Sequence, residues 1–211
     1  MIKKKLFLTS SFSTVASLFP KFHGDSLEGK KVAFIPTASN TEKVNFYVES
    51  GKKALIKLGM VPTVLDISVS KKNAIVKAIR EADLIYVSGG NTFFLLQEMR
   101  LSGADKVIKD AINSGVGYIG ESAGSIIMSP NIEYATMLDS IAAAPKLLGY
   151  DGLDEVGMYP LPHHTNVPFK KAVEKIIAAY SEKIQLCPIS NSQAIQVVGD
   201  KFSIVAKSSI A

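Results

Sequence analysis

A serine near the middle of the chain lies between glycines, in the segment Gly120–Gly124, which reads G-E-S-A-G and fits the pattern G-x-S-x-G. With glycine and serine each near about 7% of residues, a chain of this length would contain roughly 0.07 such matches by chance. In a nucleophile elbow the glycines allow a turn tight enough to hold the serine in strained backbone geometry with its hydroxyl exposed. The pattern predicts a nucleophilic serine at Ser122. The alternative is a plain glycine turn in which Ser122 caps the following helix, since the same sequence would fit it.

A serine hydroxyl is a poor nucleophile until a base removes its proton, and the chain has three histidines. His23 lies in a hydrophilic stretch and is interpreted as a surface residue. His163 and His164 follow an apolar run and a proline, where a strand is expected to end. Catalytic groups gather at such strand ends in open α/β sheets. Serine before histidine is also one of the known chain orders of catalytic triads.

The carboxylate that would orient the base is not fixed by spacing. Five acidic residues lie between the serine and the histidine pair, and all of them stay open on this argument: Glu133, Asp139, Asp151, Asp154 and Glu155.

Backbone N–H groups that stabilise developing negative charge are expected at two places. Ala123, directly after the serine, supplies one. The segment Gly89-Gly90-Asn91, at the end of a predicted central strand and the start of a helix, supplies another. A generic glycine loop of this kind could also bind phosphate, but neither a Walker lysine nor a G-x-G-x-x-G pattern accompanies it.

Short β-rich runs alternate with helical patterns, which predicts a mostly parallel sheet with helices on both faces. The elbow follows one predicted strand and the histidine pair follows another. The predicted strands are 4–9, 31–36, 62–67, 83–88, 116–120 and 158–161, and the predicted helices are 41–58, 71–81, 91–100, 104–114 and 169–180. An antiparallel hairpin is predicted over 194–206. No repeat or linker interrupts this pattern, so we expect one domain over residues 1–211.

Composition narrows the classes of protein to consider. The chain is 47% hydrophobic and 20% charged, enough to bury a sizeable core. Its net charge is +5, yet 22 of its 24 basic residues are lysines, mostly scattered in pairs, which favours a solvated surface over a nucleic-acid partner. A single cysteine, Cys187, excludes an internal disulfide and a multi-cysteine zinc site.

The basic and apolar first residues are similar to a signal peptide, but the hydroxyl residues that follow interrupt the apolar segment, so a first strand and a following loop are expected there. No run approaches the ~18 apolar residues of a membrane helix. A cytoplasmic location without a membrane partner is expected.

Three segments in order resemble one family. Residues 88–96 (SGGNTFFLL), the Gly120–Gly124 elbow and residues 162–166 (PHHTN) together resemble the peptidase E (aspartyl dipeptidase) and cyanophycinase family of serine peptidases. The likeness runs from the first strand to about Asn166 and more weakly through the C-terminal hairpin.

The resemblance implies a flavodoxin-like fold of the class I glutamine amidotransferase type. It implies that Ser122 is the nucleophile and His163 the base, with His164 as its neighbour. It also implies Gly90 and Ala123 as oxyanion donors. The family's acid follows the serine on a loop before the histidine, and Asp139 matches that placement best, although the sequence around it diverges.

The chain departs from the family where aspartyl dipeptidases carry an arginine shortly after the histidine. Residues 167–171 (VPFKK) replace that stretch, so specificity for N-terminal aspartate is not assumed. Asn91, Lys170 and Lys171 are the candidate substrate-binding residues. We therefore expect a serine hydrolase that cleaves a small peptide or related amide through an acyl-enzyme, without metal or organic cofactor. An α/β-hydrolase esterase and a catalytically silent ligand-binding relative are the alternatives.

Overall fold

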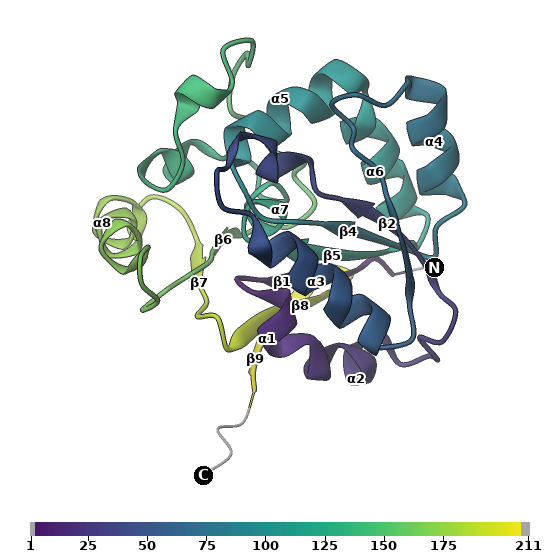
Figure 1. The fold of residues 1–211 in the computed structure, drawn as a ribbon. Helices are drawn as coiled ribbons and strands as arrows, with labels where there is room; N and C mark the ends of the chain where they lie inside the picture. Colours follow the sequence, from purple (N-terminus) through teal and green to yellow (C-terminus); the bar gives the residue numbers. More distant parts are fainter. Residues whose placement is uncertain (1–2, 208–211) are drawn as a thin grey trace.

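The computed structural model describes residues 3–207. Its main element is a seven-stranded sheet of order β3-β2-β4-β5-β1-β8-β9 (Figure 1). The strands from β3 to β1 run parallel, whereas β8 is antiparallel to β1, and β9 to β8. The bounds are β1 (Lys5–Thr9), β2 (Lys31–Ile35), β3 (Val61–Val64), β4 (Leu84–Val87), β5 (Gly117–Glu121), β8 (Gln193–Val198) and β9 (Lys201–Ala206). The expected α/β sheet with its C-terminal hairpin is confirmed.

Helices cover both faces of this sheet, as Figure 1 shows. One apolar core lies under the first three helices, and a larger one lies under the helices that follow. The first three are α1 (Phe12–Val15), α2 (Phe19–His23) and α3 (Phe46–Lys57). The others are α4 (Lys72–Arg80), α5 (Thr92–Ser102), α6 (Ala104–Asn113) and α7 (Ala123–Ile126). A second, two-stranded parallel sheet of β6 (Tyr159–Leu161) and β7 (Leu186–Pro188) is separate from the main sheet and lies beside α8 (Lys170–Tyr180).

The alternation of side chains along a strand explains the two cores. In β1, Leu6 and Leu8 belong to one core and Phe7 to the other, because successive residues of a strand point to opposite faces. In β4, all four residues are buried, as expected for a central strand of a parallel sheet covered on both sides.

The structure corrects two of the sequence-based boundaries. The helix predicted from residue 41 begins at Phe46. A 3₁₀ helix, Thr37–Thr41, precedes it and includes residue 41. The segment after β1 was expected to be a loop but contains α1, a short 3₁₀ helix and α2. Helices of four or five residues are too short to show a clear apolar period, although Phe12, Val15 and Phe19 are buried at helical spacing.

Parallel pairing brings three loops to one edge of the sheet. Thr9 is paired with Glu121, and Val87 with Gly120, so β1, β4 and β5 end side by side. The loops after these three strands therefore meet, which is where open α/β sheets place their ligands. Within residues 3–207, no helix is both long enough and apolar enough to cross a membrane.

Candidate active site

Ser122 lies in a sharp turn between β5 and α7. Its backbone has φ 49° and ψ −108°, a conformation that residues with side chains rarely adopt. A side chain at Gly120 would place its Cβ 2.5 Å from the carbonyl oxygen of Gly124, so the turn closes only with glycine there. The N–H of Ser122 donates to the Thr9 carbonyl at 2.9 Å, which fastens the turn to β1. This strand–turn–helix geometry is the one expected of a nucleophile elbow.

The imidazole of His163 lies against this serine. The Oγ atom of Ser122 and the Nε2 atom of His163 are 2.9 Å apart, although 41 residues separate them in the chain. His163 follows β6 with a φ of 66°, and its N–H donates to the Oγ atom of Ser10 at 2.9 Å. The ring of Phe169 stacks on the imidazole at 4.6 Å between centroids. The base candidate is thus held by both its backbone and its ring face.

The other ring nitrogen of His163 meets an amide. The Oδ1 atom of Asn191 lies 3.0 Å from Nδ1. Because an amide oxygen only accepts, Nδ1 carries the proton and Nε2 presents its lone pair to the Ser122 hydroxyl. Burial lowers the pKa of His163, and the Asn191 hydrogen bond opposes this by raising it. The imidazole is therefore neutral at neutral pH, the form in which it can accept a proton.

Asn191 is a site residue that sequence reasoning missed. It lies on the loop between β7 and β8, and its N–H donates to the Oδ1 atom of Asn166 at 2.8 Å. Residues 190–192 read Ser-Asn-Ser, an ordinary turn sequence, so no local signal marks the position. The expected orienting group is a carboxylate between the serine and the histidine, whereas Asn191 is an amide and follows both in the chain.

Asp139, the expected orienting acid, has a different partner in the structure. Its Oδ2 atom accepts hydrogen bonds from the N–H and the hydroxyl of Thr92, the first residue of α5. Unpaired N–H groups at a helix N-terminus attract a carboxylate, which explains this placement. Burial raises the pKa of Asp139 to about 6. The hydrogen bonds of the His163 ring in the described chain go to Ser122 and Asn191 instead.

The two expected oxyanion donors lie at the ends of neighbouring strands. In the part of the chain that the structure describes, the N–H of neither Gly90 nor Ala123 donates to a turn or loop acceptor. Gly90 has φ 133°, and a Cβ there would lie 2.2 Å from the Ala38 carbonyl. Asn91 is buried and caps α5, because its Oδ1 atom accepts from the Phe94 N–H at 2.9 Å. Its amide nitrogen donates to a backbone carbonyl, so both ends of this side chain are already bonded.

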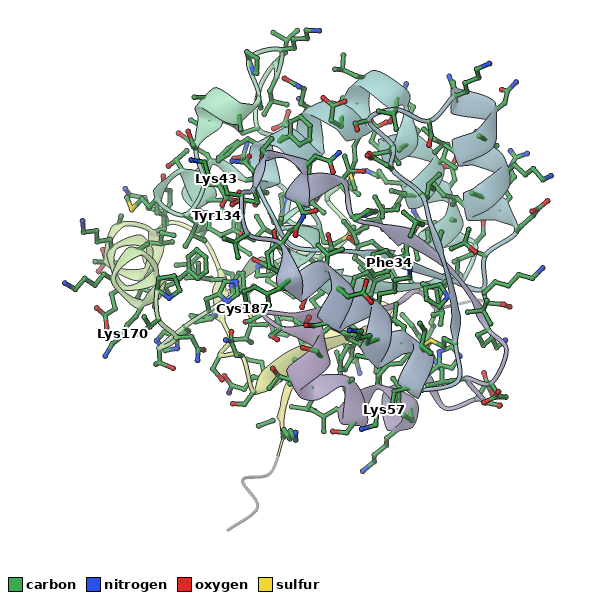
Figure 2. All side chains as sticks on the ribbon, viewed as in Figure 1. Phe34, Lys43, Lys57, Tyr134, Lys170 and Cys187 are labelled. Atoms are coloured by element: carbon green, nitrogen blue, oxygen red, sulfur yellow. The ribbon has the colours of Figure 1, made fainter. Side chains whose placement is uncertain are left out.

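The two lysines proposed to read the substrate begin α8, directly after Phe169. Both side chains are exposed, and Lys170 lies 4.0 Å from Glu174. Figure 2 shows Lys170 at the outer edge of the molecule. Of the two arginines, Arg100 donates to backbone carbonyls of residues 148, 149 and 151.

Tyr47, which lies in α3, is a second residue of the site that sequence reasoning missed. A Cβ built on Gly89 would lie 3.2 Å from the Ser122 Cβ and 3.5 Å from a ring carbon of Tyr47, so the two side chains border the same glycine. Burial, with the negative charges of Glu42, Glu121 and Asp139, raises the pKa of Tyr47 well above its usual value. Its hydroxyl therefore stays protonated and able to donate.

No group of three or more His, Cys, Asp or Glu side chains that could hold a metal ion occurs among residues 3–207. The polar groups at the sheet edge are instead a serine, a histidine and an amide in hydrogen-bonded series. The chemistry that this arrangement can perform is proton transfer from the hydroxyl to the imidazole.

Comparison with known proteins places this chain in a family. The family model of peptidase family S51 matches residues 6–205. The chain belongs to peptidase family S51. Membership makes it a peptidase, and so a hydrolase, at the level of the family, and the resemblance to peptidase E is confirmed.

Relatives in family S51 cover most of the chain. An uncharacterized peptidase of Listeria innocua is 52% identical over 194 residues, which are 92% of each chain. Peptidase E of Salmonella arizonae is 35% identical over 146 residues, 67% of this chain and 59% of its own length. A crystal structure of a Listeria monocytogenes protein provisionally named peptidase E has a TM-score of 0.94 and 49% identity, and it covers 98% of this chain and 100% of its own.

A more distant solved structure extends the likeness of fold. A peptidase from an acI-B1 actinobacterium has a TM-score of 0.73 at 21% identity, covering 98% of this chain and 89% of its own. At this identity the comparison shows a likeness of fold alone.

Proposed function

We propose that the protein is a serine peptidase that cleaves small peptides or related amides through an acyl-enzyme on Ser122. The observation that carries the proposal is the 2.9 Å contact between the Ser122 hydroxyl and Nε2 of His163, made by a serine with φ 49° at the end of β5. Strained backbone at the end of a parallel strand is a recurrent feature of catalytic nucleophiles.

The proposed reaction has two halves. Nε2 of His163 takes the hydroxyl proton as Ser122 attacks the scissile carbonyl, and the N–H groups of Gly90 and Ala123 stabilise the oxyanion. His163 then gives the proton to the leaving amine. In the second half, a water molecule loses its proton to His163 and attacks the ester carbonyl. The ester C–O bond then breaks, His163 returns the proton to the Ser122 oxygen, and the acid is released. Asn191 keeps the ring in the required tautomer throughout.

The site does not favour an aspartyl substrate. Arg100 is engaged by backbone carbonyls, and Lys170 is exposed and paired with Glu174. The ionised groups that raise the pKa of Tyr47, beside the nucleophile, are all acidic. A substrate carboxylate near Tyr47 would meet negative charge, so we propose that the acyl side of the substrate is uncharged or carries an amine.

One observation favours a second candidate, the ligand-binding relative without peptidase activity. Asn191 is neutral, and a neutral amide stabilises the imidazolium less well than a carboxylate does. A protein that binds a peptide but turns it over very slowly would have this arrangement.

A fluorophosphonate probe tests the proposal, because it labels only a serine whose hydroxyl is activated. We expect mass spectrometry to find the adduct on Ser122, with loss of labelling in Ser122→Ala and in His163→Ala. His164→Ala serves as the matched control, since the N–H of His164 donates to the Ile189 carbonyl and its ring makes no hydrogen bond in the described chain. A folded sample without an adduct on Ser122 would remove the serine-peptidase proposal and leave the binding relative.

A further inference from the structure

Glu121, the residue before the nucleophile, is a buried carboxyl that the proposed mechanism does not use. It is 3% exposed. Its Oε1 atom accepts a hydrogen bond from the Phe12 N–H at 2.9 Å, and its Oε2 atom accepts one from the Tyr86 hydroxyl at 2.6 Å. A buried carboxylate is costly unless its oxygens are bonded, and here both are.

The first bond holds the segment that contacts both the nucleophile and the base. Thr9 accepts the Ser122 N–H through its carbonyl at 2.9 Å. One residue later, Ser10 accepts the His163 N–H through Oγ at 2.9 Å and donates to the Ile189 carbonyl at 3.0 Å. Phe12, which Glu121 binds, is two residues beyond Ser10. The chain from Thr9 to Phe12 thus touches Ser122 at one end, His163 in the middle and Glu121 at the other end.

The second bond lies beneath the helix that carries Tyr47. A Cβ on Gly51 would come within 2.3 Å of the Tyr86 hydroxyl and 3.5 Å of the Glu121 carboxylate, so α3 passes directly over this pair. Tyr47 is one turn before Gly51 and therefore lies on the same side of α3. The carboxyl of Glu121 is therefore bonded to the first residue of α1 and to β4, and it lies directly beneath α3.

We propose that Glu121 is a positioning residue, which sets the spacing between the Ser122 hydroxyl and His163 by fixing the segment from Ser10 to Phe12. The proposal rests on the proposed function of the Ser122–His163 pair. Glu121 itself touches neither substrate nor reacting atoms. Because a misplacement of about 1 Å can cost roughly 100-fold in rate, loss of this anchor acts on kcat more than on KM.

Two substitutions of similar size separate the hydrogen bonds from the packing. In Glu121→Gln, the amide oxygen still accepts from Phe12 and the amide nitrogen donates to Tyr86, so the anchor is kept. In Glu121→Met, the chain length is kept and both acceptors are lost. Glu155→Gln is the matched control, since Glu155 is also buried but pairs with Lys4 and Lys109 at the opposite edge of the sheet.

The measurements are kcat and KM on a small peptide, with active-site titration by the fluorophosphonate probe. We expect Glu121→Met to lower kcat per titrated site by roughly 100-fold with KM changed less than about threefold. Glu121→Gln restores kcat to within about tenfold of the wild type, and Glu155→Gln leaves it unchanged. A purely structural role would lower the titrated fraction and leave kcat per site unaltered, which would overturn the proposal.

If Glu121→Met does not fold, Ser10→Ala tests the same path, because it removes the link from this segment to His163. We expect a loss of kcat at constant KM there as well, and wild-type kcat would overturn the proposal. Failure of the proposed function is distinguishable: in that case, the wild-type protein itself shows neither labelling of Ser122 nor turnover.

Discussion

The side-chain oxygen of Asn191 lies 3.0 Å from Nδ1 of His163, the position where a carboxylate orients the base in most serine peptidases. The amide fixes the tautomer of the ring but brings no negative charge to the imidazolium that forms during catalysis. Asn191 therefore orients the ring of His163 but stabilises its charged form less well than a carboxylate would.

Asn191→Asp is expected to raise kcat by about 10–100-fold, because a carboxylate stabilises the imidazolium and raises the pKa of His163. Turnover of a small peptide measures the effect. Asn191→Ala, which removes the acceptor and frees the ring, is expected to lower kcat. An Asp variant no faster than the wild type would show that the charge beside Nδ1 does not limit the reaction.

Activity is expected to depend on the protonation of His163. Only the neutral imidazole accepts the Ser122 proton, and burial lowers the pKa of this histidine below its ordinary 6.5. The rate of fluorophosphonate labelling should therefore rise with pH to a midpoint below 6.5 and then level off. In Asn191→Asp the midpoint should move upward, and a midpoint above 6.5 in the wild type would contradict the lowered pKa.

The contribution of Glu121 to the free energy of unfolding is expected to fall as the pH rises. Burial raises the pKa of Glu121 from 4.5 to about 7, so the folded state binds this proton more tightly than the unfolded chain does. The favourable contribution is complete below about pH 4.5 and is lost as the pH rises to 7, a change of about 3 kcal/mol. Urea unfolding at several pH values measures it. Glu121→Gln should flatten the profile in this range, and an equally steep profile would assign the dependence to other groups, such as Asp139.

The substrate preference is expected to exclude N-terminal aspartate. A dipeptide library should give lower kcat/KM for Asp-X than for Ala-X peptides, because Arg100 is bound to backbone carbonyls and the charged groups that raise the pKa of Tyr47 are acidic. Lys170→Ala and Lys171→Ala should raise KM for Asp-X at most about threefold, since exposed cations contribute little. A larger increase for one of them would instead identify that lysine as the group that reads the substrate.

The parts of the site that the sequence predicts are those with local signatures. The glycines around Ser122 and the proline before His163 mark turns at strand ends, and turn chemistry is readable within a few residues. The alternation of strands and helices likewise predicts the sheet, because apolar periodicity is local.

The hydrogen-bond partners of Asn191 and Asp139 could not be predicted from the sequence. The contact of Asn191 with His163 spans 28 residues. It depends on the pairing of β7 with β6, and β7 has three residues, too few for a recognisable strand pattern. Asp139 lies in the expected interval, but the N-terminus of α5 binds it, and that partner is 47 residues away. Tertiary packing decides which of several polar groups contacts a histidine, and the spacing of these groups in the chain does not predict the choice.

Backbone strain in this molecule is gathered at one place. Among residues 3–207, four residues other than glycine have positive φ, and three of them are Ser122, His163 and Thr165. Glycine would hold these angles at lower free energy. The serine and the histidine are therefore kept at a cost in backbone strain, and replacing either by glycine would relieve that strain only by removing the side chain that the proposed reaction needs.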